Sequence, residues 1–154
     1  MTRSLASRPR AGLRVEAFLI AAAVRVGLRC FSVARVARGL AAIPRRRAAF
    51  ADPVHHCLSA AASGAAQAAH PTCLFRALVA FALLARRDRD AVFHLGASPG
   101  EDFSAHAWVT QDGESLDLPG TRKYVSLWQQ PAREPHRADR AHLAPNRDGA
   151  GPLA

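Results

Sequence analysis

The sequence predicts an α+β fold in which helices come first and a small antiparallel sheet follows. Apolar residues recur at helical spacing over most of the chain up to residue 87, whereas the runs between residues 91 and 128 are short. Asp112-Gly113 separates two of these runs and indicates a tight hairpin, because both residues tolerate positive φ angles. With 154 residues, the chain is long enough for one domain with a single core.

Composition divides the chain into three parts. We predict a basic helical segment over residues 1–48, a core over residues 49–130 and a tail over residues 131–154. The tail is rich in proline, arginine, aspartate and glycine and has few apolar residues, so we expect it to be disordered.

The basic segment is helical from Leu13 to Ile43, where apolar residues alternate with arginines at helical spacing. We expect Gly27 to divide this stretch into two helices and Pro44 to end it. The arginines are interpreted as a solvated face, with an acidic peptide or a membrane surface as the alternative contact.

A second helical stretch begins at Asp52-Pro53, which we interpret as an N-cap followed by proline at the first helical position, and runs to about Ala69. Gly64 weakens its middle. A metal site deserves consideration because histidines and cysteines gather here. Only His70 and Cys73 have a suitable local spacing, whereas neighbours on a helix point about 100° apart, so we expect no metal and no cofactor. The other candidate ligands are His55, His56 and Cys57.

The next helix starts at Thr72, a plausible N-cap, and ends at Arg86-Arg87, whose charges suit the negative end of the helix dipole. Most of its circumference is apolar, which predicts a buried helix. Cys73 lies in the first turn, where backbone N–H groups stabilise a thiolate and so favour a nucleophile. The alternative is a cysteine packed as a small apolar side chain. Since Cys30 and Cys57 lie within apolar-periodic helices, we expect Cys73 to be the most reactive of the three thiols.

Four short runs follow, at residues 91–95, 103–110, 115–118 and 123–128. The first three are predicted strands, and the fourth is either a strand or a closing turn. Counting outward from Asp112-Gly113 pairs Trp108 with Asp117, and His106 shares a face with Trp108, so Asp117 is a diagonal neighbour of His106. The intervening predicted pairs are Gln111 with Glu114 and Thr110 with Ser115.

A cysteine at a helix N-terminus, together with a histidine and an aspartate on paired strands, is the set that thiol acyl transfer requires. Cys73 would attack a carbonyl, His106 would take and return the proton, and Asp117 would orient the imidazole. Each residue also has an ordinary structural explanation, and His94 and His70 are competing bases.

The net charge of the chain indicates what kind of partner it binds, and its cysteines indicate where in the cell it is found. The formal net charge of +9 comes almost entirely from arginine, since Lys123 is the only lysine, and it favours an acidic partner. We expect no nucleic-acid binding, because no RNA-binding signature or zinc-finger spacing is present.

An odd number of cysteines indicates free thiols and a cytoplasmic location. The run from Ala17 to Val24 is too short for a transmembrane segment, and a signal peptide is the alternative to a cytoplasmic helix there.

Several blocks of the sequence carry a resemblance to a known family. They are Thr72-Cys73-Leu74-Phe75-Arg76-Ala77-Leu78, Leu83-Leu84-Ala85-Arg86-Arg87, His94-Leu95-Gly96 and Phe103-Ser104-Ala105-His106-Ala107-Trp108-Val109 followed by Asp112-Gly113. Over about residues 50–128 the chain resembles the lasso peptide biosynthesis B2 proteins, which are leader peptidases with a transglutaminase-like, papain-related core. The chain departs from that family at Asp88, where glycine is usual, and at Thr110, where an acidic residue is common.

The resemblance implies a cysteine endopeptidase with Cys73 as nucleophile, His106 as base and Asp117 as orienting acid. It implies cleavage of a lasso precursor just before the core peptide, with the leader peptide delivered by a small leader-binding protein of the B1 (RRE) type. An ATP-dependent lasso cyclase would then act on the product. The alternatives are another transglutaminase-like acyltransferase and a non-catalytic scaffold that binds a leader.

Overall fold

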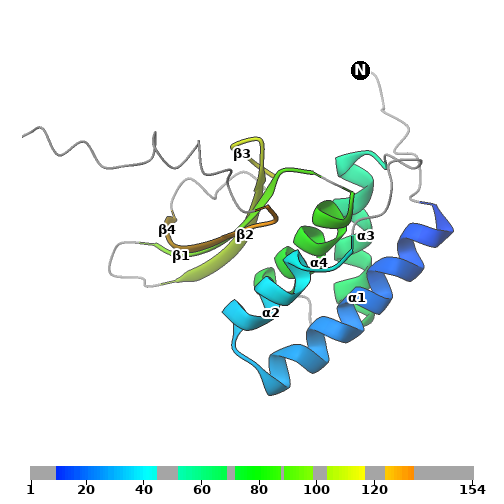
Figure 1. The fold of residues 1–154 in the computed structure, drawn as a ribbon, viewed down its shortest axis with the longest axis horizontal. Coiled ribbons are helices and arrows are strands. Elements are labelled where there is room, and N and C mark those ends of the chain that lie inside the picture. The colour runs from blue at the N-terminus through cyan, green and yellow to red at the C-terminus, as the bar shows by residue number, and fades with distance from the viewer. Residues whose placement is uncertain are drawn as a thin grey trace, which may run out of the picture.

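The computed structural model describes residues 10–44, 52–68, 72–87, 89–98, 104–116 and 124–133. Helices and strands form two layers, with the helices on one side and the sheet on the other (Figure 1). The predicted α+β class is therefore confirmed. The elements of the described ranges are α1 (Ala11–Cys30), α2 (Val33–Ala41), α3 (Val54–Gln67), α4 (Cys73–Arg86), β1 (Ala91–Ala97), β2 (Ala105–Gln111), β3 (Glu114–Ser115) and β4 (Val125–Pro131).

Helix α4 is the centre of the fold. It packs against β1 and β2 on one side and against the other three helices elsewhere. Phe75 and every residue from Ala77 to Ala85 are buried, as the nearly continuous apolar sequence predicts. The predicted cap is confirmed, because the Thr72 hydroxyl accepts a hydrogen bond from the Phe75 N–H at 3.3 Å.

Helices α1 and α2 are separated at Phe31 and Ser32, so the prediction of a break at Gly27 is wrong. Phe31 is extended, with φ −138° and ψ 158°, and Ser32 occupies the N-cap of α2. Gly27 stays within α1, and its lack of a side chain allows close packing between α1 and α2. A Cβ atom there would lie 3.2 Å from Cγ2 of Val36, so the glycine lets α2 fold back closely on α1.

Gly64 makes a similar close approach possible between α3 and α1. A Cβ atom at Gly64 would lie 3.0 Å from the backbone oxygen of Ala17. A glycine in the middle of a helix lowers the stability of that helix. Here the loss is offset by close packing of α3 on the backbone of α1, which a side chain at Gly64 would prevent.

The start of α3 differs by one residue from the prediction. Pro53 is the N-cap and Val54 the first helical residue, so Asp52 does not cap the helix. Its carboxylate instead accepts hydrogen bonds from Arg87 at the end of α4. A charged donor close by competes successfully with the neutral backbone N–H groups of the first turn.

The sheet is antiparallel with strand order β3-β2-β1-β4. The fourth predicted run, at residues 123–128, contributes to a strand, β4, and this strand pairs with β1. β1 and β4 change register between Leu95 and Gly96. Phe93, Ala107 and Val109 are buried on the side that meets α4.

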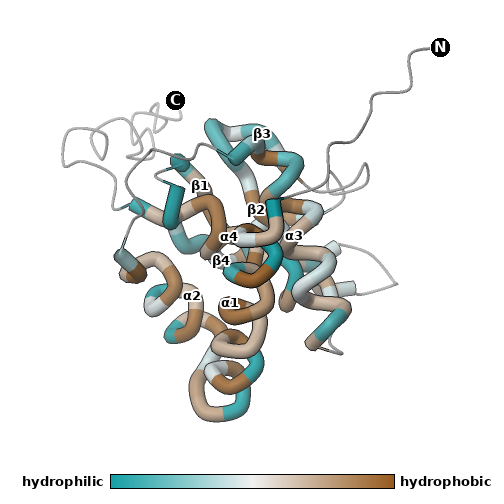
Figure 2. The backbone as a smooth tube through the Cα atoms, turned by 90° about the vertical axis from the view of Figure 1, so that its right-hand side faces the viewer, coloured by the Kyte–Doolittle hydropathy of each residue, from teal (hydrophilic) through white to brown (hydrophobic). Residues whose placement is uncertain are grey.

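One hydrophobic core joins the two layers, from Leu13 and Val24 on α1 through α4 to Phe93 on β1. Apolar residues predominate along α1, and Figure 2 shows this helix from its outer side. None of the helices in the described ranges combines the length and apolar character that crossing a membrane requires.

Candidate active site

Cys73 is the first residue of α4, directly after the Thr72 cap, and its thiol is free and half-buried. The predicted position at a helix N-terminus is therefore observed. The amide N–H groups at this end of α4 carry the partial positive charge of the helix dipole.

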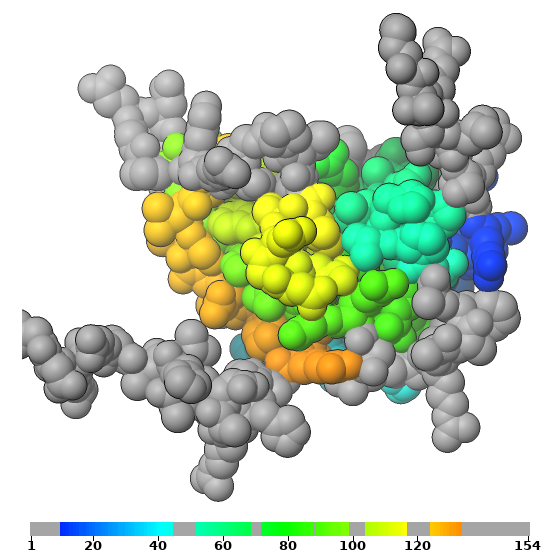
Figure 3. Space-filling model, turned by 90° about the horizontal axis from the view of Figure 1, so that it is seen from above, coloured from blue at the N-terminus to red at the C-terminus, as the bar shows by residue number. Residues whose placement is uncertain are grey.

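A pocket of about 370 Å³ adjoins Cys73. It lies between α3, α4 and β2, and it is apolar apart from Cys73 and Arg76. In the space-filling view, the end of the β2–β3 hairpin (yellow) lies against α3 (teal), whose residues share the wall of this pocket (Figure 3). The lining residues are Leu58, Ala61, Ala62, Cys73, Arg76, Ala77, Ala80, Ala107, Trp108, Val109 and Leu116.

The hairpin has the predicted turn and register. Asp112 and Gly113 have φ angles of 51° and 81°, as expected when both central residues of a two-residue turn are left-handed. Thr110 pairs with Ser115, and Gln111 pairs with Glu114. Asp117 lies outside the described residues, so its pairing with Trp108 and its nearness to His106 stay predictions.

His106 belongs to a row of stacked rings on the face of the sheet that points away from α4. Its imidazole stacks on Tyr124 with a centroid distance of 4.8 Å and on Trp108 at 6.1 Å. The indole of Trp108 in turn stacks on His94 at 5.1 Å, with the planes 5° apart. The prediction that His106 and Trp108 share a face is confirmed.

The structure brings Cys73 to the part of β2 that immediately follows His106. Ala107, Trp108 and Val109 line the pocket beside Cys73, whereas His106 is not among the described residues that line it. Trp108 adjoins both, because the residue is among those that line the pocket and its indole stacks on the His106 ring on the other face of the sheet. The role of this tryptophan was not predicted, although its place two residues after the candidate base is the signal that would have suggested it.

His94, the competing base on β1, has both ring nitrogens engaged. Its Nε2 atom lies 2.9 Å from the Thr110 hydroxyl, and its Nδ1 atom lies 3.1 Å from the Ser126 hydroxyl. Burial lowers the pKa of His94 and so favours the neutral form of the ring. These contacts describe a histidine that ties three strands together. His70, the other competing base, lies outside the described residues.

The other cysteines differ from each other. Cys57 is fully buried, and burial raises the pKa of its thiol. Cys30 is exposed at the end of α1, so the expectation that its helix shields it is wrong. The apolar pattern of α1 continues onto its solvent side, which is why periodicity alone misplaced this thiol.

The suggested metal ligands do not assemble in the described part of the chain. His55 and His56 contact each other edge to face, with ring centroids 4.3 Å apart. Across the described ranges, no group of three or more histidine, cysteine, aspartate or glutamate side chains is placed to hold a metal ion.

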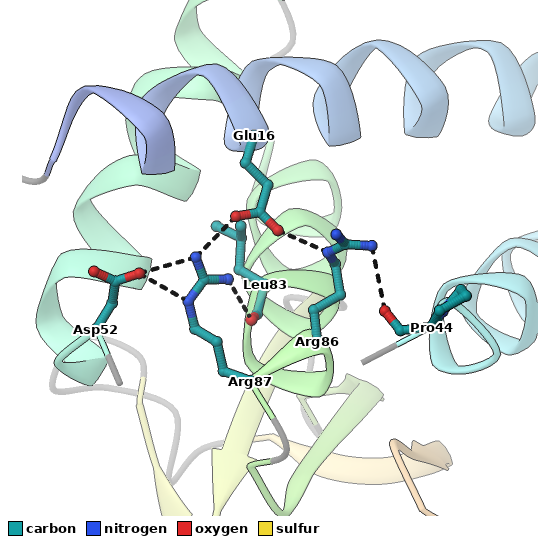
Figure 4. Close-up of polar contacts among 6 residues, drawn as sticks. All are labelled: Glu16, Pro44, Asp52, Leu83, Arg86 and Arg87. Carbon is teal, nitrogen blue, oxygen red and sulfur yellow. Dashed lines mark hydrogen bonds and ion pairs between the residues drawn. The ribbon is translucent and has the colours of Figure 1, made fainter. Parts of the chain in front are cut away.

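An ionic network fastens the far end of α4 to the N-terminal helices (Figure 4). Glu16 on α1 bridges Arg86 at 2.7 Å and Arg87 at 2.8 Å, and Arg87 also bonds Asp52 at 3.0 Å. Burial by itself raises the pKa of the Glu16 carboxyl, but hydrogen bonds from Arg87 and Arg86 outweigh this and leave the pKa below its usual range. The predicted favourable contact with the helix end is also present, since Arg87 Nη1 donates to the Leu83 carbonyl at 3.0 Å.

Sequence reasoning missed this network, although a signal for it exists. Glu16 is the only acidic residue before Asp52 in an arginine-rich stretch. A lone carboxylate among many arginines at the start of an otherwise apolar helix is a candidate for a buried ion pair.

The chain matches a family model described as the transglutaminase-like superfamily over residues 18–143. The match begins within α1 and includes Cys73, the β2–β3 hairpin and β4. Comparison with curated proteins finds no significant match, and comparison with solved structures finds none either. Because the match spans most of its length, the chain belongs to the transglutaminase-like superfamily.

Proposed function

We propose that this protein is a cysteine endopeptidase that removes the leader peptide from a lasso precursor. The observation that carries the proposal is the placement of Cys73 at the start of a buried helix, beside the segment of β2 that follows His106. Membership of the transglutaminase-like superfamily supports thiol acyl chemistry, because that superfamily includes cysteine proteases and acyltransferases. The resemblance of the motif blocks to the B2 proteins supports the narrower assignment.

In the proposed reaction, the Cys73 sulfur attacks the carbonyl carbon of the last leader residue. The carbon–nitrogen bond of that peptide unit breaks, and His106, having taken the thiol proton, returns it to the departing core amine. Water then hydrolyses the thioester and releases the leader as a free acid. Asp117 orients the imidazole of His106 throughout.

The pocket supports a preference for an apolar substrate side chain. Alanines, leucines, Val109 and Trp108 make up most of its lining, and Arg76 is the one charged residue among the described residues that line it. Burying a charged side chain there would require an ionic partner, whereas burying an aliphatic one contributes about 25 cal/mol for each Å² removed from water. An aliphatic side chain near the scissile bond is therefore favoured.

The test is product analysis with purified protein, precursor and leader-binding protein in water enriched in oxygen-18. Hydrolysis places one heavy oxygen on the leader carboxyl group and leaves a free core amine, both visible by mass spectrometry. The Cys73→Ala variant should form neither product, whereas Cys30→Ala should behave as the wild type because Cys30 is exposed at the end of α1 and is not among the residues that line the pocket.

Two outcomes would replace the proposal. Transfer of the leader acyl group to an added amine with little hydrolysis would identify an acyltransferase. Tight leader binding with an intact precursor would identify a non-catalytic scaffold.

A further inference from the structure

Tyr124 lies directly before β4, and its ring contacts two rings of β2. Its centroid is 4.8 Å from that of His106 and 6.4 Å from that of Trp108, with interplanar angles of 26° and 39°. The His106 and Trp108 rings are themselves 6.1 Å apart and 13° from parallel. These separations form a triangle within the range of about 4.5–7 Å that is usual for paired aromatic rings. The phenol ring therefore lies against both rings of β2.

The strand register explains how Tyr124 reaches β2, although β1 separates β2 from β4. Gly96 of β1 pairs with His106 on one side and with Ser126 on the other, so the three positions share the outer face of the sheet. Tyr124 is two residues before Ser126 and therefore belongs to the same face. Because Gly96 has no side chain, the rings from the two sides can meet above β1.

The Tyr124 hydroxyl group makes a contact of a different kind. It accepts a hydrogen bond from the hydroxyl of Ser104, the residue before β2, at 3.4 Å. This bond is long and exposed to solvent, so it contributes little to stability. The contact between Tyr124 and His106 accordingly depends on the aromatic ring and not on the hydroxyl.

The imidazole of His106 needs neighbours to fix its plane. Rotation about the Cβ–Cγ bond of histidine has only a broad torsional preference, so packing must select the orientation. His106 is half-buried, and both the indole of Trp108 and the phenol of Tyr124 lie close to parallel with its ring. A general base must keep its nitrogen within hydrogen-bond reach of the proton, and a misplacement of about 1 Å can lower a rate about 100-fold.

Trp108 is held in place without Tyr124. The indole stacks on His94 of β1 at 5.1 Å with the planes 5° apart, and Trp108 is buried. Tyr124 is half-buried and reaches His106 from the opposite side of β1. Replacing Tyr124 should therefore leave the indole where it is and remove the 4.8 Å ring contact of the imidazole.

We propose that Tyr124 is a positioning residue, which holds the imidazole of His106 in the orientation that proton transfer with Cys73 requires. This inference rests on the proposed function, which assigns that transfer to His106. Tyr124 acts through His106 and takes no part in bond making. The strand β4 contributes to the reaction in this way, although none of its residues is among the described residues that line the Cys73 pocket.

The first test separates kcat from KM with purified precursor and leader-binding protein. Tyr124→Leu removes the planar ring but keeps an apolar side chain, so kcat should fall about 10-fold or more while KM changes less than about twofold. Tyr124→Phe keeps the ring and should retain at least about half of the wild-type kcat. Leu127→Ala is the matched control, since Leu127 is 72% exposed on β4, and it should behave as the wild type.

The second test uses nuclear magnetic resonance and does not depend on cleavage. Cross-peaks between the imidazole protons of His106 and the indole protons of Trp108 should be present in the wild type and in Tyr124→Phe, and they should weaken in Tyr124→Leu. The spectrum of His106→Gln assigns the imidazole signals. Tyr124→Met is included so that the result does not depend on one variant, and urea unfolding verifies that each variant is folded.

Three results would overturn the inference. The first is a wild-type kcat in Tyr124→Leu and Tyr124→Met. The second is a loss of kcat in Tyr124→Phe as large as that in Tyr124→Leu, which would assign the effect to the hydroxyl. The third is an unchanged set of cross-peaks between His106 and Trp108 in Tyr124→Leu. Absence of cleavage by the wild type would refute the proposed function instead, and the cross-peaks would still decide whether Tyr124 holds the imidazole.

Discussion

The indole ring of Trp108 lies against the Cα atom of Gly96. A Cβ atom at Gly96 would lie 2.7 Å from Cη2 and 2.8 Å from Cζ3 of Trp108. Gly96 pairs with His106 across the strands, so the indole crosses diagonally over the neighbouring pair. The absence of a side chain at Gly96 thus leaves room for the ring that stacks on His106.

Gly96→Ala should destabilise the protein by about 1–3 kcal/mol, because an added methyl group must displace both the Val125 carbonyl of β4 and the Trp108 ring. It should also alter the near-ultraviolet circular dichroism of the indole and slow cleavage. Urea unfolding and the dichroism spectrum check these effects. Gly39→Ala is the control, since nothing lies within 4 Å of a Cβ atom there, and it should stabilise α2 by about 0.5–1 kcal/mol.

Thiol reactivity should follow the placement of the three cysteines. In a Cys30→Ala background, which removes the exposed competitor, iodoacetamide should modify Cys73 about 10-fold faster or more than the buried Cys57. Mass spectrometry of peptides after limiting reagent checks this. Cys57 should react only after urea is added, and its preferential labelling in the folded protein would point to a different nucleophile.

The three proposed catalytic residues should differ in the severity of their variants. His106→Ala should abolish cleavage because His106 is the proposed acceptor of the Cys73 proton, whereas Asp117→Asn should leave a residual rate about 10⁴-fold below wild type. Leader affinity should be unchanged in both variants. Full activity of Asp117→Asn would remove the orienting role from that residue, and full activity of His106→Ala would require another base.

Narrowing the pocket should change substrate choice. Ala62→Phe places a ring at the exposed rim of the pocket and should raise KM for a precursor with a large aliphatic residue before the cleavage site. Ala66→Phe, one turn further along α3 and also exposed, is the matched control. Steady-state kinetics with leucine and alanine at that substrate position would show the effect, and identical kinetics of both variants would place the substrate elsewhere.

Acid should loosen the attachment of α4 to the N-terminal helices. The folded-state pKa of Glu16 lies below its usual value of 4.5, so the contribution of the ion pairs is complete above pH 4.5 and is lost as the pH falls through the lowered pKa. Glu16→Gln should therefore cost about 2–3 kcal/mol at pH 7, and the difference from wild type should shrink in acid.

Urea unfolding of both proteins between pH 7 and pH 3 checks this dependence. Glu114→Gln, at an exposed position of β3, should stay close to wild type throughout. A constant difference between wild type and Glu16→Gln across that pH range would show that the carboxylate contributes through packing and not through charge.

Local sequence was sufficient for much of the site. The Thr72 cap, the start of α4 at Cys73 and the left-handed turn at Asp112 and Gly113 each depend on a few neighbouring residues. The shared face of His106 and Trp108 follows from the two-residue period of a strand, which holds wherever no bulge interrupts it.

Other features were decided by residues distant in sequence. The helix break lies at Ser32 because Gly27 is occupied by packing against Val36, a contact that no local propensity contains. Asp52 is drawn from the expected cap to Arg87, and the strand β4 pairs with β1.

The sequence by itself determined which segments are helix or strand, where the candidate nucleophile begins its helix and how the hairpin pairs, because these depend on backbone preference and short-range periodicity. Only the tertiary structure decided that Trp108 adjoins both the Cys73 pocket and the His106 ring, that Glu16 closes the far end of α4 and that one face of α1 stays exposed. These features arise from the competition of many side chains for the same buried space and the same charged partners, and that competition is settled only when distant segments meet.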